Sequence, residues 1–321
     1  MNMELTPEKV FEDFNDKKID KNTAAELLIS LIDNTDTEDT RIECIEKLKE
    51  ISVNNDKLFH YMENLLISDL NAKVRCAAAN YIKEFFRDKA LSLIKWAVEF
   101  ESDYYCLCTI IQTIVELNNE ESKSILIDML KNIRKTKYLD EKNRIENKKF
   151  KRAIKKLIKK ERIKNSTHEE LAEIIINYLT ISTLSKKFYS VYFELEDALV
   201  VKLDLADVEY EVRGWKADFK NNIEELSEIT GLENLHHLIH LNLSNNQISS
   251  IKELINLKFL THLYIFNNKI RDLKELEYLK EISCLKYIDL SGNPIAKHLS
   301  PEFFNNENFK DIKIVIKKYI L

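Results

Sequence analysis

A repeated pattern of apolar residues constrains the fold of this chain more than any other feature. Three stretches follow the template L-x-x-L-x-L-x-x-N-x-I. The copies are Leu238, Leu241, Leu243, Asn246 and Ile248; Leu260, Leu263, Ile265, Asn268 and Ile270; and Leu285, Ile288, Leu290, Asn293 and Ile295. Leu241 and Leu263 are 22 residues apart, and Leu263 and Ile288 are 25 apart (263 − 241 and 288 − 263). Five fixed positions that recur three times predict a repeated structural unit.

The chemistry of one copy explains why the copies must stack. The L-x-L segment predicts a short strand whose alternate side chains point inward. One copy cannot bury that face alone, so we expect neighbouring copies to form a parallel sheet. Asn246, Asn268 and Asn293 should form a buried ladder, because their amides can satisfy turn backbone groups that would otherwise be unpaired.

The template resembles the leucine-rich repeat, and its short period is similar to the SDS22/internalin-like class. The resemblance implies a parallel-sheet solenoid over residues 166–321 that offers a surface for protein binding. Residues 188–205 alternate in polarity and predict a hairpin cap. Phe309, Ile312 and Ile314 predict a C-terminal capping strand. A capping box at 166–169 predicts a helix that ends at about Leu179.

The first part of the chain has helical periodicity. We expect helices at 23–34, 38–53, 56–68, 71–87, 89–101, 103–117 and 120–135. Leu48 recurs as Ile82 and again as Ile114, which indicates stacked helix pairs. The segment 69–85 resembles the HEAT repeat, with Asp69, Val74 and Arg75 at the matching positions. This resemblance implies a HEAT-like α-α superhelix over 1–165, in which Asp69 and Arg75 have structural roles.

Positive charge is concentrated in one segment, residues 141–164. It holds twelve Lys/Arg and three Glu, a net charge of +9, whereas residues 1–140 carry 19 − 27 = −8 and residues 165–321 carry 18 − 24 = −6. Its apolar stripe predicts the last helix of the helical domain. The predicted outer face, a basic patch, is Lys148, Lys149, Lys151, Arg152, Lys155, Lys156, Lys159 and Lys160.

Three interpretations of this basic helix remain open. It is a solvated amphipathic helix, a docking site for an acidic protein segment, or a phosphate-binding element for nucleic acid or an anionic membrane. Nucleic acid is not favoured, because the segment lacks interleaved aromatic residues on which bases stack.

The strand positions between the inward leucines form the predicted partner-binding surface. Its candidate residues are His240, Asn242, His262, Tyr264, Phe266, Tyr287 and Asp289, and the flanking strands add Lys202, Asp204, Asp311 and Lys313. Aromatic anchors with a polar rim are typical of protein interfaces. The alternative is that the rings cover sheet surface or contact the neighbouring domain. His240, His262 and Asp289 could supply metal ligands, but solvated histidines are the default, so no metal site is predicted.

Composition argues against most enzyme classes. With only Gly214, Gly231 and Gly292, the chain cannot assemble a phosphate-binding loop, a dinucleotide fingerprint or a nucleophile elbow. HEAT-like solenoids include base-excision glycosylases, but no local motif for that chemistry is present. We therefore predict no enzyme and no cofactor, and instead a scaffold or adaptor that binds proteins through the concave faces of its repeats.

The cellular location is predicted from three negative signals. None of the five cysteines forms a C-x-x-C pair, which favours a reducing compartment. The N-terminal residues lack the apolar core of a signal peptide, and no apolar run is long enough to span a membrane. We expect a cytoplasmic protein with protein partners.

Overall fold

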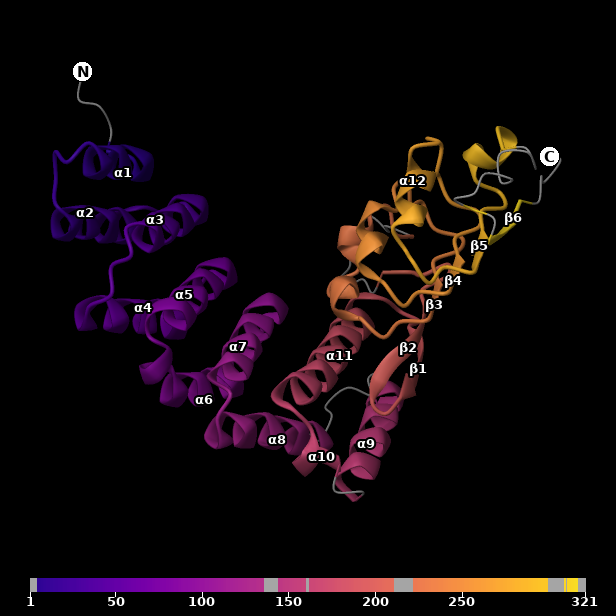
Figure 1. Cartoon of the computed structure of the whole chain (residues 1–321), viewed down its shortest axis with the longest axis horizontal. Coiled ribbons are helices and arrows are strands. Elements are labelled where there is room, and N and C mark those ends of the chain that lie inside the picture. Colours follow the sequence, from indigo (N-terminus) through magenta and orange to yellow (C-terminus); the bar gives the residue numbers. More distant parts are fainter. Residues whose placement is uncertain are drawn as a thin grey trace, which may run out of the picture. The chain divides into compact units, whose positions relative to one another are not determined.

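The computed structural model describes residues 5–135, 144–159, 162–210, 222–299, 309 and 311–316. The chain divides into two compact units, Met1–Met129 and Leu130–Leu321. The first consists of helices, and the second contains helices and a sheet (Figure 1). No helix among the described residues is long and apolar enough to cross a membrane.

Helices of the first unit follow each other through short turns. They are α1 (Pro7–Asn15), α2 (Lys21–Asn34), α3 (Glu38–Glu50), α4 (Asp56–Ser68), α5 (Ala72–Phe85), α6 (Ala90–Phe100) and α7 (Tyr104–Leu117), with the 3-10 helix η1 (Arg87–Lys89) before α6. Helix α8 (Glu120–Lys135) crosses the division between the units. Helix α2 begins two residues before the predicted start, because the Asp20 side chain accepts a hydrogen bond from the Thr23 N–H and caps it.

The helices of the first unit pack in pairs, and successive pairs contact each other. Helices α2 and α3, α4 and α5, and α6 and α7 contact each other, and α5 lies between α3 and α7. The matched residues Leu48, Ile82 and Ile114 are all buried at 1% exposure or less. The predicted helical periodicity is confirmed, because the matched positions all face the interior of their helix pairs.

Ion pairs join the turns of this unit. The Arg75 guanidinium donates through Nε and Nη2 to Glu101 at 2.7 and 2.9 Å, and through Nη1 to the carbonyl of Asp69 at 2.9 Å. The Asp69 carboxylate pairs with Arg41. Asp69 and Arg75 therefore connect consecutive turns, which is the structural role expected of them.

The Glu101 carboxylate makes the first unit sensitive to acid. Desolvation raises its pKa, but hydrogen bonds from Arg75, Cys106 and the backbone of Ser102 and Asp103 outweigh it and lower the pKa to about 2. Because the folded pKa lies below the usual value of a glutamate, 4.5, the stabilisation is present above about pH 5 and is lost as the pH falls towards 2. We expect this loss to be on the order of 3 kcal/mol. Urea unfolding at several pH values should show a smaller pH dependence for Glu101→Gln, and equal slopes for the two proteins would contradict the assignment.

The second unit contains α9 (Arg144–Lys159), α10 (Arg162–Asn165) and α11 (His168–Lys187), followed by a sheet that has six strands among the described residues. The strands lie in sequence order: β1 (Tyr192–Glu196), β2 (Leu199–Asp204), β3 (His240–Asn242), β4 (His262–Tyr264), β5 (Tyr287–Asp289) and β6 (Lys313–Val315). Strands β1 and β2 form an antiparallel hairpin, and β2 to β6 are parallel. Short helices connect them: η2 (Leu226–Glu228), η3 (Leu232–Asn234), η4 (Lys252–Asn256), α12 (Glu275–Lys280) and η5 (Pro294–Lys297).

The template leucines set the register of the sheet. Leu203, Leu241, Leu263, Ile288 and Ile314 pair in one row across β2 to β6. The first four are completely buried. The predicted side-by-side placement of Leu241, Leu263 and Ile288 is confirmed, and strands flank the three repeats at both ends.

The three buried asparagines form the predicted ladder. The Oδ1 atoms of Asn246, Asn268 and Asn293 accept the backbone N–H groups of Ile223, Ile248 and Ile270, respectively. The Nδ2 group of each asparagine donates to backbone carbonyls. Asn268, for example, accepts from the Ile248 N–H at 2.9 Å and donates to the Leu243 carbonyl at 2.9 Å. The amides thus satisfy buried turn groups in two neighbouring repeats.

Helix α9 packs within the second unit, whereas the sequence suggested that it closes the helical domain. Phe150 is 1% exposed, and its ring lies 5.5 Å from that of Phe193 and 5.6 Å from that of Tyr178. The apolar face of α9 therefore covers β1 and α11. The units divide between Met129 and Leu130, and the predicted domain boundary at 165/166 stays a prediction.

Candidate partner-binding surface

Two parallel rows of side chains cross the outward face of the sheet. We call the first the basic row; it consists of Lys202, His240, His262, Tyr287 and Lys313. We call the second the acidic row; it consists of Asp204, Asn242, Tyr264, Asp289 and Val315. Both rows follow from the strand period, because residues on either side of an inward leucine point to the opposite face.

Aromatic rings form a continuous stack in the middle of these rows. The ring centroids of His240 and His262 are 4.4 Å apart, and those of His262 and Tyr287 are 5.7 Å apart, with interplanar angles of 27° and 23°. Tyr264 joins from the acidic row, 5.2 Å from Tyr287. All four rings are half-buried. Their register places them, since one strand spacing of about 4.8 Å suits stacked planar groups.

A lysine lies at each end of the basic row. Lys313 Nζ lies 5.8 Å from the Tyr287 ring centroid. At the other end, Lys202 Nζ lies 5.5 Å from the Tyr192 ring and donates to Glu194 at 3.2 Å. The basic row is therefore an aromatic centre between two lysines.

His240 carries no charge at neutral pH. Desolvation, followed by the neighbouring His262 and Lys202, lowers the pKa of His240 below 6.5. His262 Nδ1 lies 2.8 Å from the Thr261 hydroxyl, which itself donates to the Ile239 carbonyl. The Thr261 hydroxyl thus links the His262 ring to the Ile239 carbonyl.

The acidic row is ordered by local hydrogen bonds. Asp204, Asn242 and Asp289 each accept, through Oδ1, the backbone N–H two residues later, at 3.0, 3.1 and 2.9 Å. These bonds fix the carboxylates of Asp204 and Asp289 on the sheet surface. The two rows therefore present opposite charges along one face.

Most of the predicted binding residues lie together. His240, Asn242, His262, Tyr264, Tyr287 and Asp289 occupy the two rows. Phe266 lies beyond the end of β4 and is half-buried, and no ring contact joins it to Tyr264 or Tyr287 in the described structure. Asp311 precedes β6. Whether this surface binds a partner stays a prediction.

Sequence reasoning missed the contribution of β1. Tyr192 donates to Glu194 at 2.8 Å, and Glu194 also pairs with Lys202. The alternation of residues 192, 194 and 196 was a usable signal, because it places these side chains on one face of the hairpin. No group of three or more metal-ligating side chains occurs among the described residues, so His240, His262 and Asp289 do not converge on one point.

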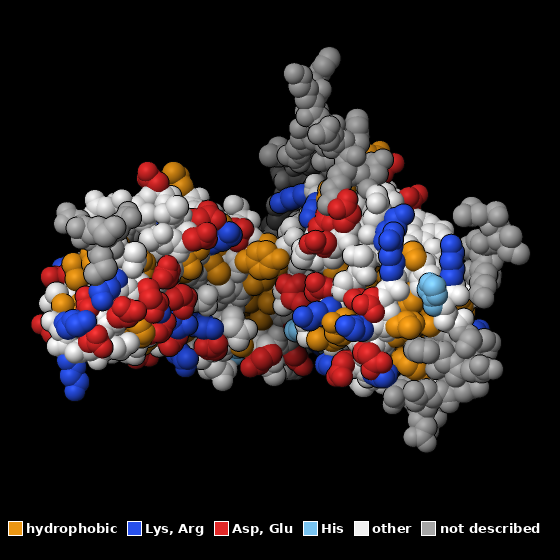
Figure 2. Space-filling model, turned by 90° about the horizontal axis from the view of Figure 1, so that it is seen from above, with side chains coloured by type: hydrophobic (Ala, Val, Ile, Leu, Met, Phe, Trp, Pro, Cys, Tyr) orange, Lys and Arg blue, Asp and Glu red, His pale blue; other side chains and the backbone are white. Residues whose placement is uncertain are grey.

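The predicted basic patch is only partly exposed. Lys149 donates to the Phe193 carbonyl at 2.7 Å and lies over the Tyr192 and Phe193 rings at 4.5 and 4.6 Å, so it holds α9 on the hairpin. Lys151 is half-buried, and Lys160 lies outside the described residues. The exposed members are Lys148, Arg152, Lys155, Lys156 and Lys159. On the face shown in Figure 2, cations and carboxylates interleave over both units.

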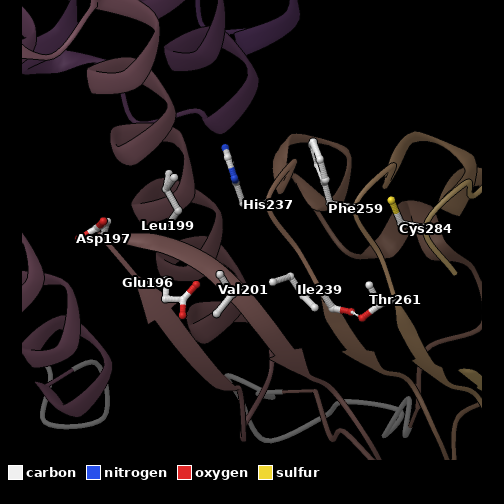
Figure 3. A pocket seen from close by; sticks show the side chains of 9 residues that line it. All are labelled: Glu196, Asp197, Leu199, Val201, His237, Ile239, Phe259, Thr261 and Cys284. Carbon is white, nitrogen blue, oxygen red and sulfur yellow. Dashed lines mark hydrogen bonds between the residues drawn. The ribbon is translucent and has the colours of Figure 1, made fainter. Parts of the chain in front are cut away.

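A hollow of about 410 Å³ lies beside the two rows, where the strands begin. Figure 3 shows its lining side chains: Glu196, Asp197, Leu199, Val201, His237, Ile239, Phe259, Thr261 and Cys284. A second, more open and more polar hollow of about 730 Å³ lies along the turns that follow the strands, beside Asn245 and Asn267. The parallel strands thus carry one apolar edge and one polar edge.

Comparison with known proteins agrees with the repeat geometry. Residues 236–278 match the family model for leucine-rich repeats in two copies, and residues 284–306 match a model of the single leucine-rich repeat. The predicted resemblance to this repeat is confirmed for these residues. A search of curated proteins found no match.

Two solved structures of Listeria monocytogenes proteins are similar to part of the chain. Internalin C2 is 27% identical over 28% of this chain and 36% of its own, with a TM-score of 0.23. An internalin, inlF, is 23% identical over 39% of each chain, with a TM-score of 0.25. The chain thus spans less than half the length of either protein.

Proposed function

We propose that this protein is a non-catalytic interaction scaffold that binds a partner protein on the basic and acidic rows of its sheet. The observation that carries the proposal is the stack of His240, His262, Tyr287 and Tyr264, four half-buried rings on one open face. Rigid rings supply contact area at low cost in conformational entropy.

The charges around the rings support a protein partner of complementary charge. Lys202 and Lys313 flank the stack in one row, and Asp204 and Asp289 lie in the other. Charges at the rim of an interface contribute more to orientation and association rate than to affinity. A partner would therefore dock in one direction on the sheet.

The helical unit belongs to the same proposal as a second interaction module. Leu48, Ile82 and Ile114 occupy equivalent buried positions in successive helix pairs, and Arg75 and Asp69 connect the turns. Both features support a HEAT-like superhelix. An adaptor with two repeat modules and a cytoplasmic location is the simplest function for this combination.

Replacing two rings tests the proposed surface. Tyr264→Ala with Tyr287→Ala should weaken partner binding at least tenfold, because truncated interface anchors typically cost 2 kcal/mol or more. Quantitative pull-down with both proteins, followed by titration against the recovered partner, measures the change. Tyr189→Ala is the matched control, since Tyr189 is 60% exposed and lies before β1. Unchanged recovery by the folded double variant would remove this face from consideration.

The exposed stripe of α9 supports a second candidate, binding of anionic phosphate surfaces. Lys148, Arg152, Lys155 and Lys159 follow the spacing of one helix face, over about 16 Å. None of them pairs with a carboxylate within the described part of the chain. Binding of a 20-base-pair DNA should weaken steeply between 50 and 200 mM salt, as is general for phosphate contacts (about tenfold or more). No mobility shift at low salt would exclude nucleic acid.

A further inference from the structure

The hollow at the start of the strands is built from equivalent positions of successive repeats. Leu199, His237, Phe259 and Cys284 each lie four residues before the inward leucine or isoleucine of their strand, and Val201, Ile239 and Thr261 lie two residues before it. The hollow is therefore a groove that crosses four strands (Figure 3). Its form follows from the repeat and not from one irregular loop.

The groove presents apolar surface and few free hydrogen-bonding groups. His237 and Phe259 stack at 6.0 Å with an interplanar angle of 6°, and Phe259 remains 56% exposed. The carbonyl of Ile239 accepts the N–H groups of Thr261 and His262, and the carbonyl of Thr261 accepts those of Lys286 and Tyr287. Since these acceptors are already used, an occupant gains mainly from apolar and stacking contacts.

The negative charge at the hairpin end of the groove favours a positively charged occupant. Glu196 and Asp197 lie at the hairpin turn that closes the groove. Arg162 neutralises Asp197 at 2.7 Å, whereas exposed Glu196 forms no ion pair with another described residue. Glu173 does not line the hollow and pairs with His237 and His236 at 3.3 and 3.6 Å, so within the lining Glu196 is the carboxylate without an ion-pair partner among the described residues. This end is therefore acidic, and it favours a cation.

We propose that this groove binds a segment of a partner protein that places an aromatic side chain beside Phe259 and an adjacent Arg or Lys beside Glu196. The volume of about 410 Å³ is that of a small ligand pocket and holds one or two large side chains. This contact is separate from the ring stack of the basic and acidic rows, since the two share no residue. A partner that docks on the rows reaches the groove along the same strands.

Binding of a short probe to the full chain tests the proposal. N-acetyl-Arg-Trp-amide should bind saturably in NMR titrations, and N-acetyl-Glu-Trp-amide should bind about threefold to fivefold more weakly, as expected for one exposed charge pair. Phe259→Ala should abolish the saturable binding of both peptides. Glu196→Gln should leave binding intact and remove the preference for Arg. Equal binding by Phe259→Ala, or no preference for Arg in the unaltered protein, would overturn the proposal.

The reactivity of Cys284 provides an independent test of peptide binding in the groove. Its thiol is half-buried there, so saturating N-acetyl-Arg-Trp-amide should slow the alkylation of this thiol by N-ethylmaleimide. Peptide mass spectrometry measures the alkylation rate. Cys76, also half-buried but on α5, is the control thiol and should react at an unchanged rate. The double variant Tyr264→Ala, Tyr287→Ala should still bind the peptide. Loss of binding in that variant, or no protection of Cys284, would place the peptide elsewhere and reject the groove.

Discussion

Phe150→Ala should lower the free energy of unfolding of the second unit by about 3–5 kcal/mol, the range for removing a buried ring. Phe150 is 1% exposed and contacts the rings of Phe193 and Tyr178. The truncation leaves a cavity between α9, the β1–β2 hairpin and α11, because these elements cannot close it without moving the sheet. Hydrogen exchange followed by mass spectrometry, combined with urea unfolding, measures the loss separately for each unit.

The placement of α9 depends on this result. Lys148→Ala is the matched control on the same helix; its side chain is exposed, so the change should stay within about 0.5 kcal/mol. Protection of the sheet amides should fall in Phe150→Ala while that of α2 to α7 is retained. If Phe150→Ala left the sheet unaffected, α9 would not belong to the second unit.

Asn268→Leu should destabilise the second unit by about 3–5 kcal/mol, although leucine is apolar and similar in size. The Asn268 side chain accepts from the Ile248 N–H and donates to the carbonyls of Leu243 and Ile265, all buried. Each buried group that loses its partner costs about 1–3 kcal/mol, and leucine replaces none of these bonds. Urea unfolding monitored by circular dichroism gives the change in free energy.

Gln247→Leu is the control for Asn268→Leu. Gln247 is exposed in the corresponding turn of the preceding repeat, so its replacement should change stability by no more than about 0.5 kcal/mol. A loss below about 1 kcal/mol in Asn268→Leu would mean that water or a shifted turn satisfies the freed groups, and that the ladder is not essential.

The sequence predicted the local periodic structure well and the ends of elements less well. Helix α11 runs to Lys187, not to about Leu179, because Ile181 and Leu184 are buried in the core of the second unit. Its cap is Thr167, whose side chain accepts from the Glu170 N–H in a reciprocal capping box. Local signals marked the start of this helix, but its end depended on packing against the sheet.

The candidate surface was predicted in composition but not in arrangement. The strand period placed His240, His262, Tyr264 and Tyr287 on one face, which the structure confirms. That the rings stack, and that desolvation keeps His240 uncharged, depends on strand register and side-chain conformation. The groove beside Phe259 was not predicted, because positions two and four residues before each inward leucine or isoleucine carry no common residue type.

The sequence by itself determined the sheet of the second unit and the stacking of helix pairs in the first. A repeat of fixed period brings Leu241, Leu263 and Ile288 into one row, since each copy can bury its apolar face only against the next. Only the tertiary structure decided which surface the basic helix covers. Its amphipathic pattern requires that Phe150 be buried, but several apolar faces could accept it, and the hairpin supplies the ring of Phe193 and a carbonyl for Lys149.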